Sequence, residues 1–385
     1  MKTRIAAIRN RIASLSLCLL VVAGWLAAPL NLDAAGCKLR FRQTYLGKVT
    51  FQLYSFGNVV ADFNGDGNAD FALLESDDQI HVYNGDGAGH FGPPATYSGG
   101  NFAYTIAVGD FNGDGRPDIV VGDDSIGLQI LLNNGSGGFA APVEIPLETS
   151  QIQQLLVADF NRDGNLDIAV SDYTNGSTLV LLGDGHGGFG APIVTPIGGG
   201  LMAVGDFNGD GIPDLAVATT DLQILLGDGA GGFTVGSSYS FGAGNPTTVA
   251  VADFNRDGHV DLAVSTINSP PTEVATFLGD GTGSFVASTT VPFDYPEGLL
   301  AVDIDGDGNV DLVVSEYSFL AVAKGNGRGG FGPIRQYPLT VPRKTPGAGH
   351  LSTGDFNGDG VPDFVTSDYL TSGATVLITG CGGMQ

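Results

Sequence analysis

The chain has 385 residues, of which 61 are glycine, and its formal net charge is −25 with only 16 lysine and arginine residues. So acidic a chain is a poor partner for nucleic acid or for an anionic membrane surface, and we expect neither. Hydrophobic residues make up 43% of the chain, which is enough for a large core and excludes a disordered acidic tail.

Residues 1–35 have the layout of a secretory signal peptide. Four basic residues precede an apolar run over residues 15–28, and small residues follow at Ala34, Ala35 and Gly36. We therefore expect residues 36–385 to form one exported domain, either secreted or at the cell surface. The apolar run is short for a membrane span, and an uncleaved membrane anchor is the alternative.

A nine-residue acidic motif, D-x-[N/D]-x-D-G-x-x-D, recurs through the rest of the chain. Its seven copies start at Asp62, Asp110, Asp159, Asp206, Asp253, Asp303 and Asp355. Successive starts are 47 to 52 residues apart, a regularity that chance does not give.

Each copy has the same surroundings. Short apolar stretches rich in β-branched residues flank it, a third stretch follows, and a glycine-rich turn ends in an aromatic residue, as in residues 85–91. Four short strands per unit of about 48 residues are typical of a propeller blade. The sequence thus predicts an all-β, seven-bladed β-propeller with four antiparallel strands per blade. A linear β-solenoid is the alternative.

The two ends of the repeat region favour the ring. The seventh unit stops at residues 380–383 and lacks a fourth strand, while Phe41 lies 21 residues before Asp62, within the range of 17 to 24 residues that separates each turn phenylalanine from the next motif. We therefore expect residues 40–45 to form the outer strand of the last blade. This pairing of first and last segments closes the ring and removes both exposed edges.

Two cysteines, Cys37 and Cys381, bracket the expected domain. In an exported protein two thiols are more often paired than free, and both fall at the turn where the last hairpin is cut open, so we expect a disulfide. The alternative is lipidation of Cys37, because residues 34–37 resemble a lipobox, although the first position is not Leu or Val. The chain would then be an anchored lipoprotein.

The motif has the chemistry of a calcium loop. Positions 1, 3, 5 and 9 carry oxygen side chains, position 6 is always glycine, and position 7 varies, as expected where only its carbonyl is used. The expected ligands are Asp62, Asn64, Asp66, Asp70, Asp110, Asn112, Asp114, Asp118, Asp159, Asn161, Asp163, Asp167, Asp206, Asn208, Asp210, Asp214, Asp253, Asn255, Asp257, Asp261, Asp303, Asp305, Asp307, Asp311, Asp355, Asn357, Asp359 and Asp363. We expect up to seven Ca²⁺ ions. The alternative, Asx turns without metal, crowds like charges together.

These repeats resemble the FG-GAP/VCBS family, the units of the integrin α-subunit propeller. The resemblance lies in strings such as residues 108–118 and in turns such as residues 135–139, and it covers the chain from Cys37 onward. It implies calcium between the first and second strands of each blade. Unit six departs by carrying Asp305 in place of Asn, and unit seven lacks its turn Phe.

The face of the propeller away from the motifs is expected to bind the ligand. Aromatic residues with nearby acids suit sugar stacking or a protein interface, and the tyrosines expected there are Tyr104, Tyr173, Tyr295, Tyr317 and Tyr369. We thus expect a monomeric module that recognises an extracellular glycan or protein, by adhesion or as a lectin. A polysaccharide lyase or hydrolase is the alternative, although the five histidines form no acid–base constellation in the sequence.

Overall fold

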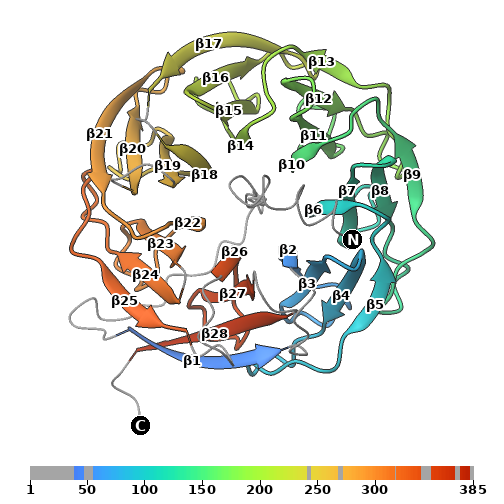
Figure 1. Cartoon of the computed structure of the whole chain (residues 1–385), viewed down its shortest axis with the longest axis horizontal. Helices are drawn as coiled ribbons and strands as arrows, with labels where there is room; N and C mark the ends of the chain where they lie inside the picture. The colour runs from blue at the N-terminus through green and yellow to red at the C-terminus, as the bar shows by residue number, and fades with distance from the viewer. Residues whose placement is uncertain are drawn as a thin grey trace, which may run out of the picture.

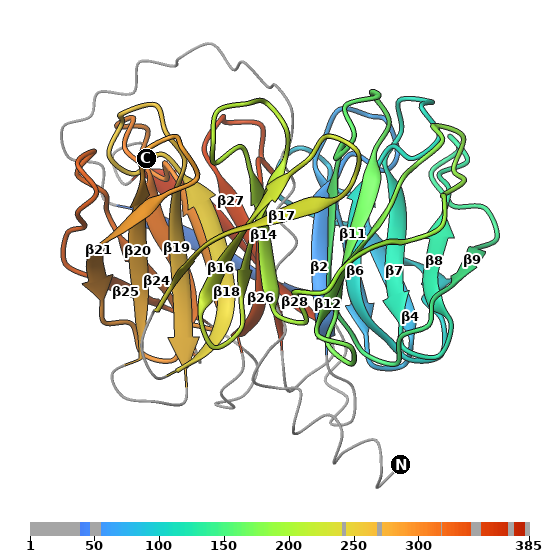
Figure 2. The same ribbon diagram turned by 90° about the horizontal axis from the view of Figure 1, so that it is seen from above.

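The computed structural model describes residues 39–46, 55–240, 244–267, 272–316, 318–339, 348–368 and 373–381. These residues form 28 strands and no helix, arranged as seven four-stranded sheets around a central axis (Figure 1). Seen from the side, the strands run from one face of the ring to the other (Figure 2). The predicted seven-bladed, all-β propeller is confirmed. None of the described residues belongs to a helix that could cross a membrane.

Each blade is an antiparallel meander whose first strand lies nearest the axis. The strands of the first three blades are β2 (Ser55–Ala61), β3 (Asp70–Glu75), β4 (Gln79–Tyr83) and β5 (Ala95–Ser98); β6 (Ala103–Gly109), β7 (Asp118–Asp123), β8 (Gly127–Leu131) and β9 (Val143–Pro146); β10 (Ile152–Ala158), β11 (Asp167–Asp172), β12 (Ser177–Leu181) and β13 (Ile193–Thr195). Those of the next three are β14 (Leu201–Gly205), β15 (Asp214–Ala218), β16 (Leu222–Gly227) and β17 (Phe233–Tyr239); β18 (Asn245–Ala252), β19 (Asp261–Ile267), β20 (Glu273–Gly279) and β21 (Phe285–Val291); β22 (Gly298–Val302), β23 (Asp311–Glu316), β24 (Phe319–Ala323) and β25 (Arg335–Pro338).

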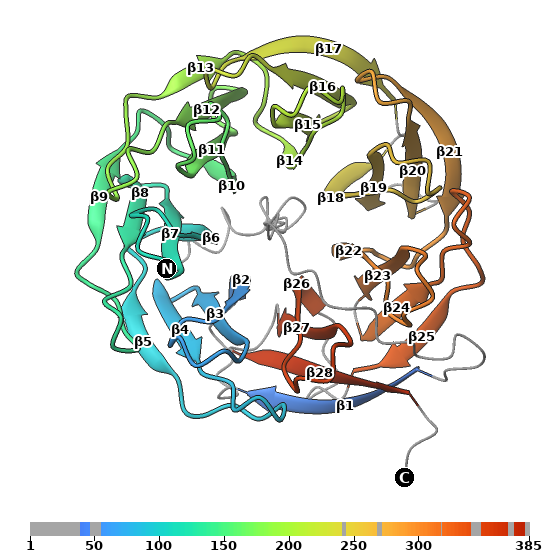
Figure 3. The same cartoon turned by 180° about the vertical axis from the view of Figure 1, so that it is seen from behind.

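The seventh blade joins the two ends of the chain. It contains β26 (Ala348–Gly354), β27 (Asp363–Asp368), β28 (Ala374–Cys381) and, as its outer strand, β1 (Leu39–Leu46). Strand β1 pairs antiparallel with β28 along its whole length, from Leu39 opposite Cys381 to Leu46 opposite Ala374 (Figure 3). The predicted closure by the N-terminal strand is therefore confirmed. Cys37 and the side chain of Cys381 lie outside the described residues, and so does the expected signal peptide.

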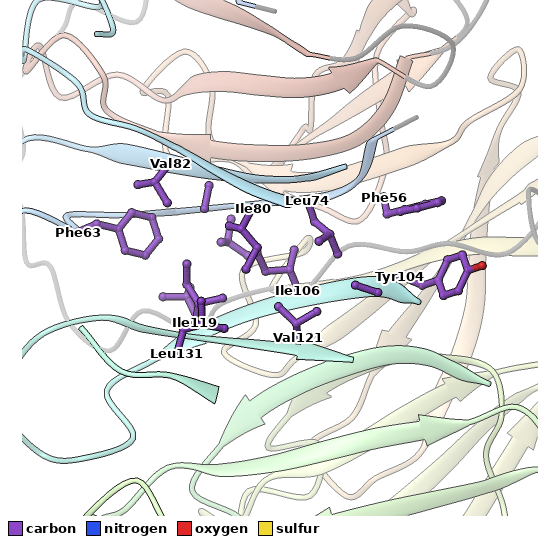
Figure 4. Close-up of a cluster of buried hydrophobic side chains, with 14 residues drawn as sticks. Phe56, Phe63, Leu74, Ile80, Val82, Tyr104, Ile106, Ile119, Val121 and Leu131 are labelled. Carbon is purple, nitrogen blue, oxygen red and sulfur yellow. The ribbon is translucent and has the colours of Figure 1, made fainter. Parts of the chain in front are cut away.

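The hydrophobic core is divided among the interfaces between blades. Seven clusters of buried side chains are present in the described residues, and each joins two adjacent blades. Figure 4 shows the cluster between the first and second blades, where Ile80 and Leu74 face Ile106 and Val121. The middle strands are covered on both sides, which is why β3 is buried over its whole length. The ring is thus held by nearest-neighbour packing.

A ring of phenylalanines repeats at these interfaces. The aromatic residue at motif position 2 packs edge to face on the turn phenylalanine of the next blade, with ring centroids 5.3 to 5.8 Å apart. The six pairs are Phe63–Phe139, Phe111–Phe189, Phe160–Phe233, Phe207–Phe285, Phe254–Phe331 and Phe356–Phe91. At the remaining interface Ile304 takes the motif position and lies in one cluster with Phe41. Each acidic motif is therefore fixed to its neighbouring blade.

Candidate functional site

The seven acidic motifs lie on one face of the propeller, called the loop face below. Each motif closes the hairpin between the first and second strands of its blade, and its position 9 begins the second strand, as in the pair Ala61–Asp70. Because all seven first strands run in the same direction across the ring, all seven motifs end on the same side. The repeat in sequence thus becomes a circle of acidic loops.

The first loop, residues 62–70, shows the geometry that the others repeat. Both carboxylate oxygens of Asp62 accept backbone N–H groups across the turn, Oδ1 from Gly65 at 2.8 Å and Oδ2 from Gly67 at 2.8 Å. The side chain of Asn64 accepts the N–H of Asp66 at 2.8 Å. Gly67 has φ of 86°, which favours glycine. The oxygens of positions 1, 3 and 5 are therefore gathered around a tight turn.

Position 9 is the buried member of each loop. In the first loop Asp70 is 0% exposed, and its Oδ2 accepts the N–H of Phe63 at 2.9 Å while its Oδ1 accepts that of Gly85 at 2.7 Å. The same two bonds recur in the other six loops, made by Asp118, Asp167, Asp214, Asp261, Asp311 and Asp363. Position 9 thus ties the acidic loop to the outer turn of its own blade. The sequence predicted a ligand here, and this structural role was missed.

Burial makes these carboxylates unfavourable as anions. Burial raises the pKa of Asp70 to about 6, with the nearby carboxylate of Asp66 contributing to this increase. Burial likewise raises the pKa of Asp363 to about 7, with the charges of Asp359 and Asp355 adding to the effect. A bound cation would relieve both the like-charge repulsion and the desolvation.

The donor set fits a hard divalent cation. Every motif position expected to bind metal carries an oxygen, and none carries Cys or His. In the sixth loop, carboxylate oxygens of Asp303, Asp305 and Asp311 all lie within 4.8 Å of one another. The residues present are therefore those that would hold Ca²⁺.

Basic side chains reach three of the seven loops. Arg116 pairs with Asp114 within the second loop, and Lys324, from the β24–β25 turn, pairs with Asp305 in the sixth. Two arginines cross to the next blade: Arg162 Nη1 donates to the carbonyl of Asp210 in the fourth loop at 3.4 Å, and Arg256 reaches the sixth loop at Asn309. Ion pairs thus partly neutralise the second and sixth loops, whereas the contact to the fourth loop is with a backbone carbonyl.

The two crossing arginines occupy a strained position. Arg162 and Arg256 are at motif position 4, where the other five loops have glycine, and their φ angles are 60° and 62°. A non-glycine residue in this region costs of order 1 kcal/mol. The inter-blade contacts of the guanidinium groups offset this cost, which explains why arginine is found there.

The other face, called the opposite face below, carries the ends of the second strands. Five residues after position 9, four blades have a described acid: Glu75, Asp123, Asp172 and Glu316. Three of them hold the chain as it enters their own blade. Asp123 accepts the N–H of Asn101 at 2.6 Å, Asp172 accepts the hydroxyl of Thr149 at 2.7 Å, and Glu316 accepts the N–H of Asp294 at 2.8 Å. These acids are structural clamps.

The fourth of these acids, Glu75, lies beside other titratable side chains. Burial raises its pKa to about 7, with the charge of Asp77 adding to the effect, and His81 Nε2 lies 3.6 Å from its carboxylate. The ligand atoms of Glu75, Asp77 and His81 lie within 4.8 Å of one another. This is a place where the described residues bring a histidine to two carboxylates.

A cavity of about 400 Å³ opens on the opposite face at the fourth blade. It lies where β10, β14 and β18 begin and β11 and β15 end. Its lining residues are Gln153, Tyr173, Gly176, Gly198, Gly199, Gly200, Leu201, Ala218, Thr219, Thr220, Asn245 and Pro246. The volume is within the range of small-molecule sites, ~300–1,000 Å³.

The tyrosines expected on this face differ in exposure. Tyr173 is 57% exposed and lines the cavity, and Tyr295 is 38% exposed. Tyr104 differs from the expectation: it is 7% exposed and its ring centroid lies 4.8 Å from that of Phe56, because it lies at the start of an inner strand that the preceding blade covers. Tyr317 and Tyr369 lie outside the described residues.

The fold and its loops define a class: a β-propeller whose blades each close on an acidic hairpin. The sequence also assigns the chain to a family. The FG-GAP-like repeat model matches residues 62–121, 110–170, 159–217, 206–264 and 303–366. These matches span well over half of the chain, so it belongs to the FG-GAP-like repeat family, as the resemblance predicted. No curated protein matches it in sequence.

Two solved structures are similar to the whole propeller. One is an Agrocybe aegerita lectin that recognises non-reducing terminal N-acetylglucosamine, with a TM-score of 0.57, 19% identity, and coverage of 84% of this chain and 87% of that one. The other is BBS1N in complex with ARL6DN, with a TM-score of 0.63, 14% identity, and coverage of 89% and 97%. At these identities the similarity concerns the fold.

Proposed function

We propose that this chain is an exported, calcium-loaded β-propeller that binds an extracellular glycan or protein through its opposite face, without catalysis. The observation that carries the proposal is that the two faces carry different features. All seven acidic loops occupy one face, whereas the other holds an uncharged cavity beside an exposed tyrosine, Tyr173. Such a cavity is typical of a binding site.

Calcium would be held by positions 1, 3, 5 and 9 of each loop. The oxygen-only donors and the crowded, buried carboxylates support this assignment. Bound calcium would supply positive charge where the loops concentrate negative charge, and so stabilise the hairpins that join each blade to the next.

Export is proposed from the first 35 residues, together with a disulfide between Cys37 and Cys381. The backbone supports the pairing, since Cys381 lies opposite Leu39, two residues after Cys37. Lipidation of Cys37 remains the competing proposal, and mass spectrometry of the exported protein separates the two. A disulfide there would close almost the whole domain.

The neighbours in structure support ligand binding of two kinds. One is named as a lectin, and the other is named in complex with a protein. We therefore propose a single test with two arms, a glycan array and a pull-down with extracellular proteins, each run with calcium and with chelator. Glycan hits favour a lectin, and protein partners without glycan hits favour adhesion. Failure of both arms, or turnover of a polysaccharide, contradicts the proposal.

A further inference from the structure

The fourth blade departs from the pattern of clamps on the opposite face. Counting five residues from position 9 leads to Thr219, where most blades have an acid, and Thr219 is exposed. The fifth blade also has a threonine, Thr266, but that residue is 3% exposed and donates its hydroxyl to Glu273 O. Among the blades whose side chain at this position is described, only the fourth has an exposed residue there, and the cavity is found at that blade.

Glycine forms the inner wall of this cavity. A Cβ atom on Gly198 would lie 2.4 Å from the backbone of Ser177, and one on Gly200 would lie 2.2 Å from the carbonyl oxygen of Ala218. Contacts this short exclude any side chain. The chain entering the blade thus lies directly on the backbone at the start of β12 in the third blade and at the end of β15 in its own blade.

The lining is uncharged although the chain carries a net charge of −25. The nearest clamp acid, Asp172, turns its carboxylate to Thr149 and Asn175 instead. Amide and hydroxyl groups come from Gln153, Asn245 and Thr219, and the exposed ring of Tyr173 supplies an apolar surface. No charged side chain lines the cavity to pair with an anion or a cation, whereas a neutral ligand with hydroxyl groups and one apolar face fits the lining.

We infer that the cavity at the fourth blade binds a neutral sugar residue. The ring of the sugar packs on Tyr173 while its hydroxyl groups exchange hydrogen bonds with the amide and hydroxyl groups of the lining. The inference rests on the proposed function, because it assigns the glycan branch of that function to one site and one chemical class.

Two variants and a matched control test the site. Thr219→Asp restores the acid that most blades carry and places a charge in the cavity, and Tyr173→Ala removes the apolar surface. Phe102→Ala is the control, because Phe102 is also exposed on the opposite face but does not line the cavity. The neutral glycan that binds wild type best on an array is then titrated by calorimetry, with thermal unfolding as the check on folding.

We expect both cavity variants to bind about tenfold more weakly or worse, and the control to bind like wild type. If wild type binds neutral glycans and all three variants bind equally well, the site is wrong but the proposed function stands. If wild type binds only charged glycans, or no glycan while it captures protein partners, the sugar assignment is overturned. If it binds neither, the proposed function fails as well.

Discussion

The two faces of this propeller are built on different rules. On the loop face, seven hairpins carry the same acids at the same positions, and each position 9 makes the same two backbone hydrogen bonds. On the opposite face, the equivalent strand ends carry Glu, Asp or Thr, and the acids that hold the incoming chain accept a backbone N–H in the second and sixth blades but a hydroxyl in the third. The loop face repeats because one structural task recurs in every blade. The opposite face is free to vary, which is what a recognition surface requires.

Metal removal gives the largest expected effect and is the most direct test of the difference between the two faces. Chelation should lower the melting temperature by roughly 10 °C or more, since each lost ion returns a loop to uncompensated carboxylates, and added calcium should restore it. Scanning calorimetry with EDTA, then with excess calcium, measures both steps. An unchanged melting curve after exhaustive chelation would mean that the loop face is held by hydrogen bonds alone.

The buried acid of a loop should matter more than an exposed one, even without metal. In chelator, Asp167→Ala leaves the N–H groups of Phe160 and Gly183 without their acceptor, and we expect a loss of about 3 kcal/mol in unfolding free energy. Asp163→Ala is the matched control from the same loop, because Asp163 is exposed. Urea unfolding of both variants checks the difference. Equal losses would contradict the structural role of position 9.

Spacing in the sequence predicted the loop face well. The positions of the seven motifs, and the 21 residues between Phe41 and Asp62, were sufficient to predict the ring and its closing strand. These features depend on contacts within a repeat or on its period, and both can be counted along the chain.

Contacts between blades were not predicted. Arg162 reaches Asp210, 48 residues away, and which side chain crosses to a neighbour depends on the packing angle between blades. The burial of Tyr104 has the same origin, since inner strands are covered on both sides by neighbouring blades. The sequence does contain one signal of the cavity. Alignment of the units on position 9 shows Thr219 where most units have an acid.

A buried acid on the opposite face gives a pH-dependent prediction. Glu297 precedes β22, its Oε2 is buried with no hydrogen-bond partner among the described residues, and burial raises its pKa from 4.5 to about 8. Between these pH values the unfolded chain is ionised while the folded one keeps the proton. Wild type therefore loses stability as pH rises from 4.5 to 8, and the loss is then constant.

Glu297→Gln removes this titration. We therefore expect the unfolding free energy of the variant, relative to that of wild type, to rise by roughly 2–4 kcal/mol between pH 5 and pH 8. Urea unfolding in saturating calcium at both pH values measures the gain. Glu144→Gln, at an exposed position, should show no such trend. A stability difference for Glu297→Gln that does not change with pH would show that the carboxyl group finds a partner or water.

The smallest expected effect concerns differences among the seven loops. The sixth loop carries four carboxylates instead of three, and Lys324, at a position that is leucine in the second to fifth blades, pairs with the extra one at Asp305. The net charge of the loop and its lysine therefore equals that of a three-carboxylate loop. An ammonium group in this place competes with a metal ion for the oxygens of Asp305.

We expect Lys324→Leu to tighten calcium binding at the sixth loop severalfold, about 1 kcal/mol, as measured by calorimetric titration. Arg328→Leu, in the same turn, should leave affinity unchanged, because the described hydrogen bonds of Arg328 are made by its backbone. Asp305→Asn in the Lys324→Leu background recreates the common loop and should return affinity toward wild type. With Asp305→Asn alone as the second single variant, we expect the two changes not to be additive. Additive effects would separate Lys324 from the metal and leave the sixth loop equivalent to the others.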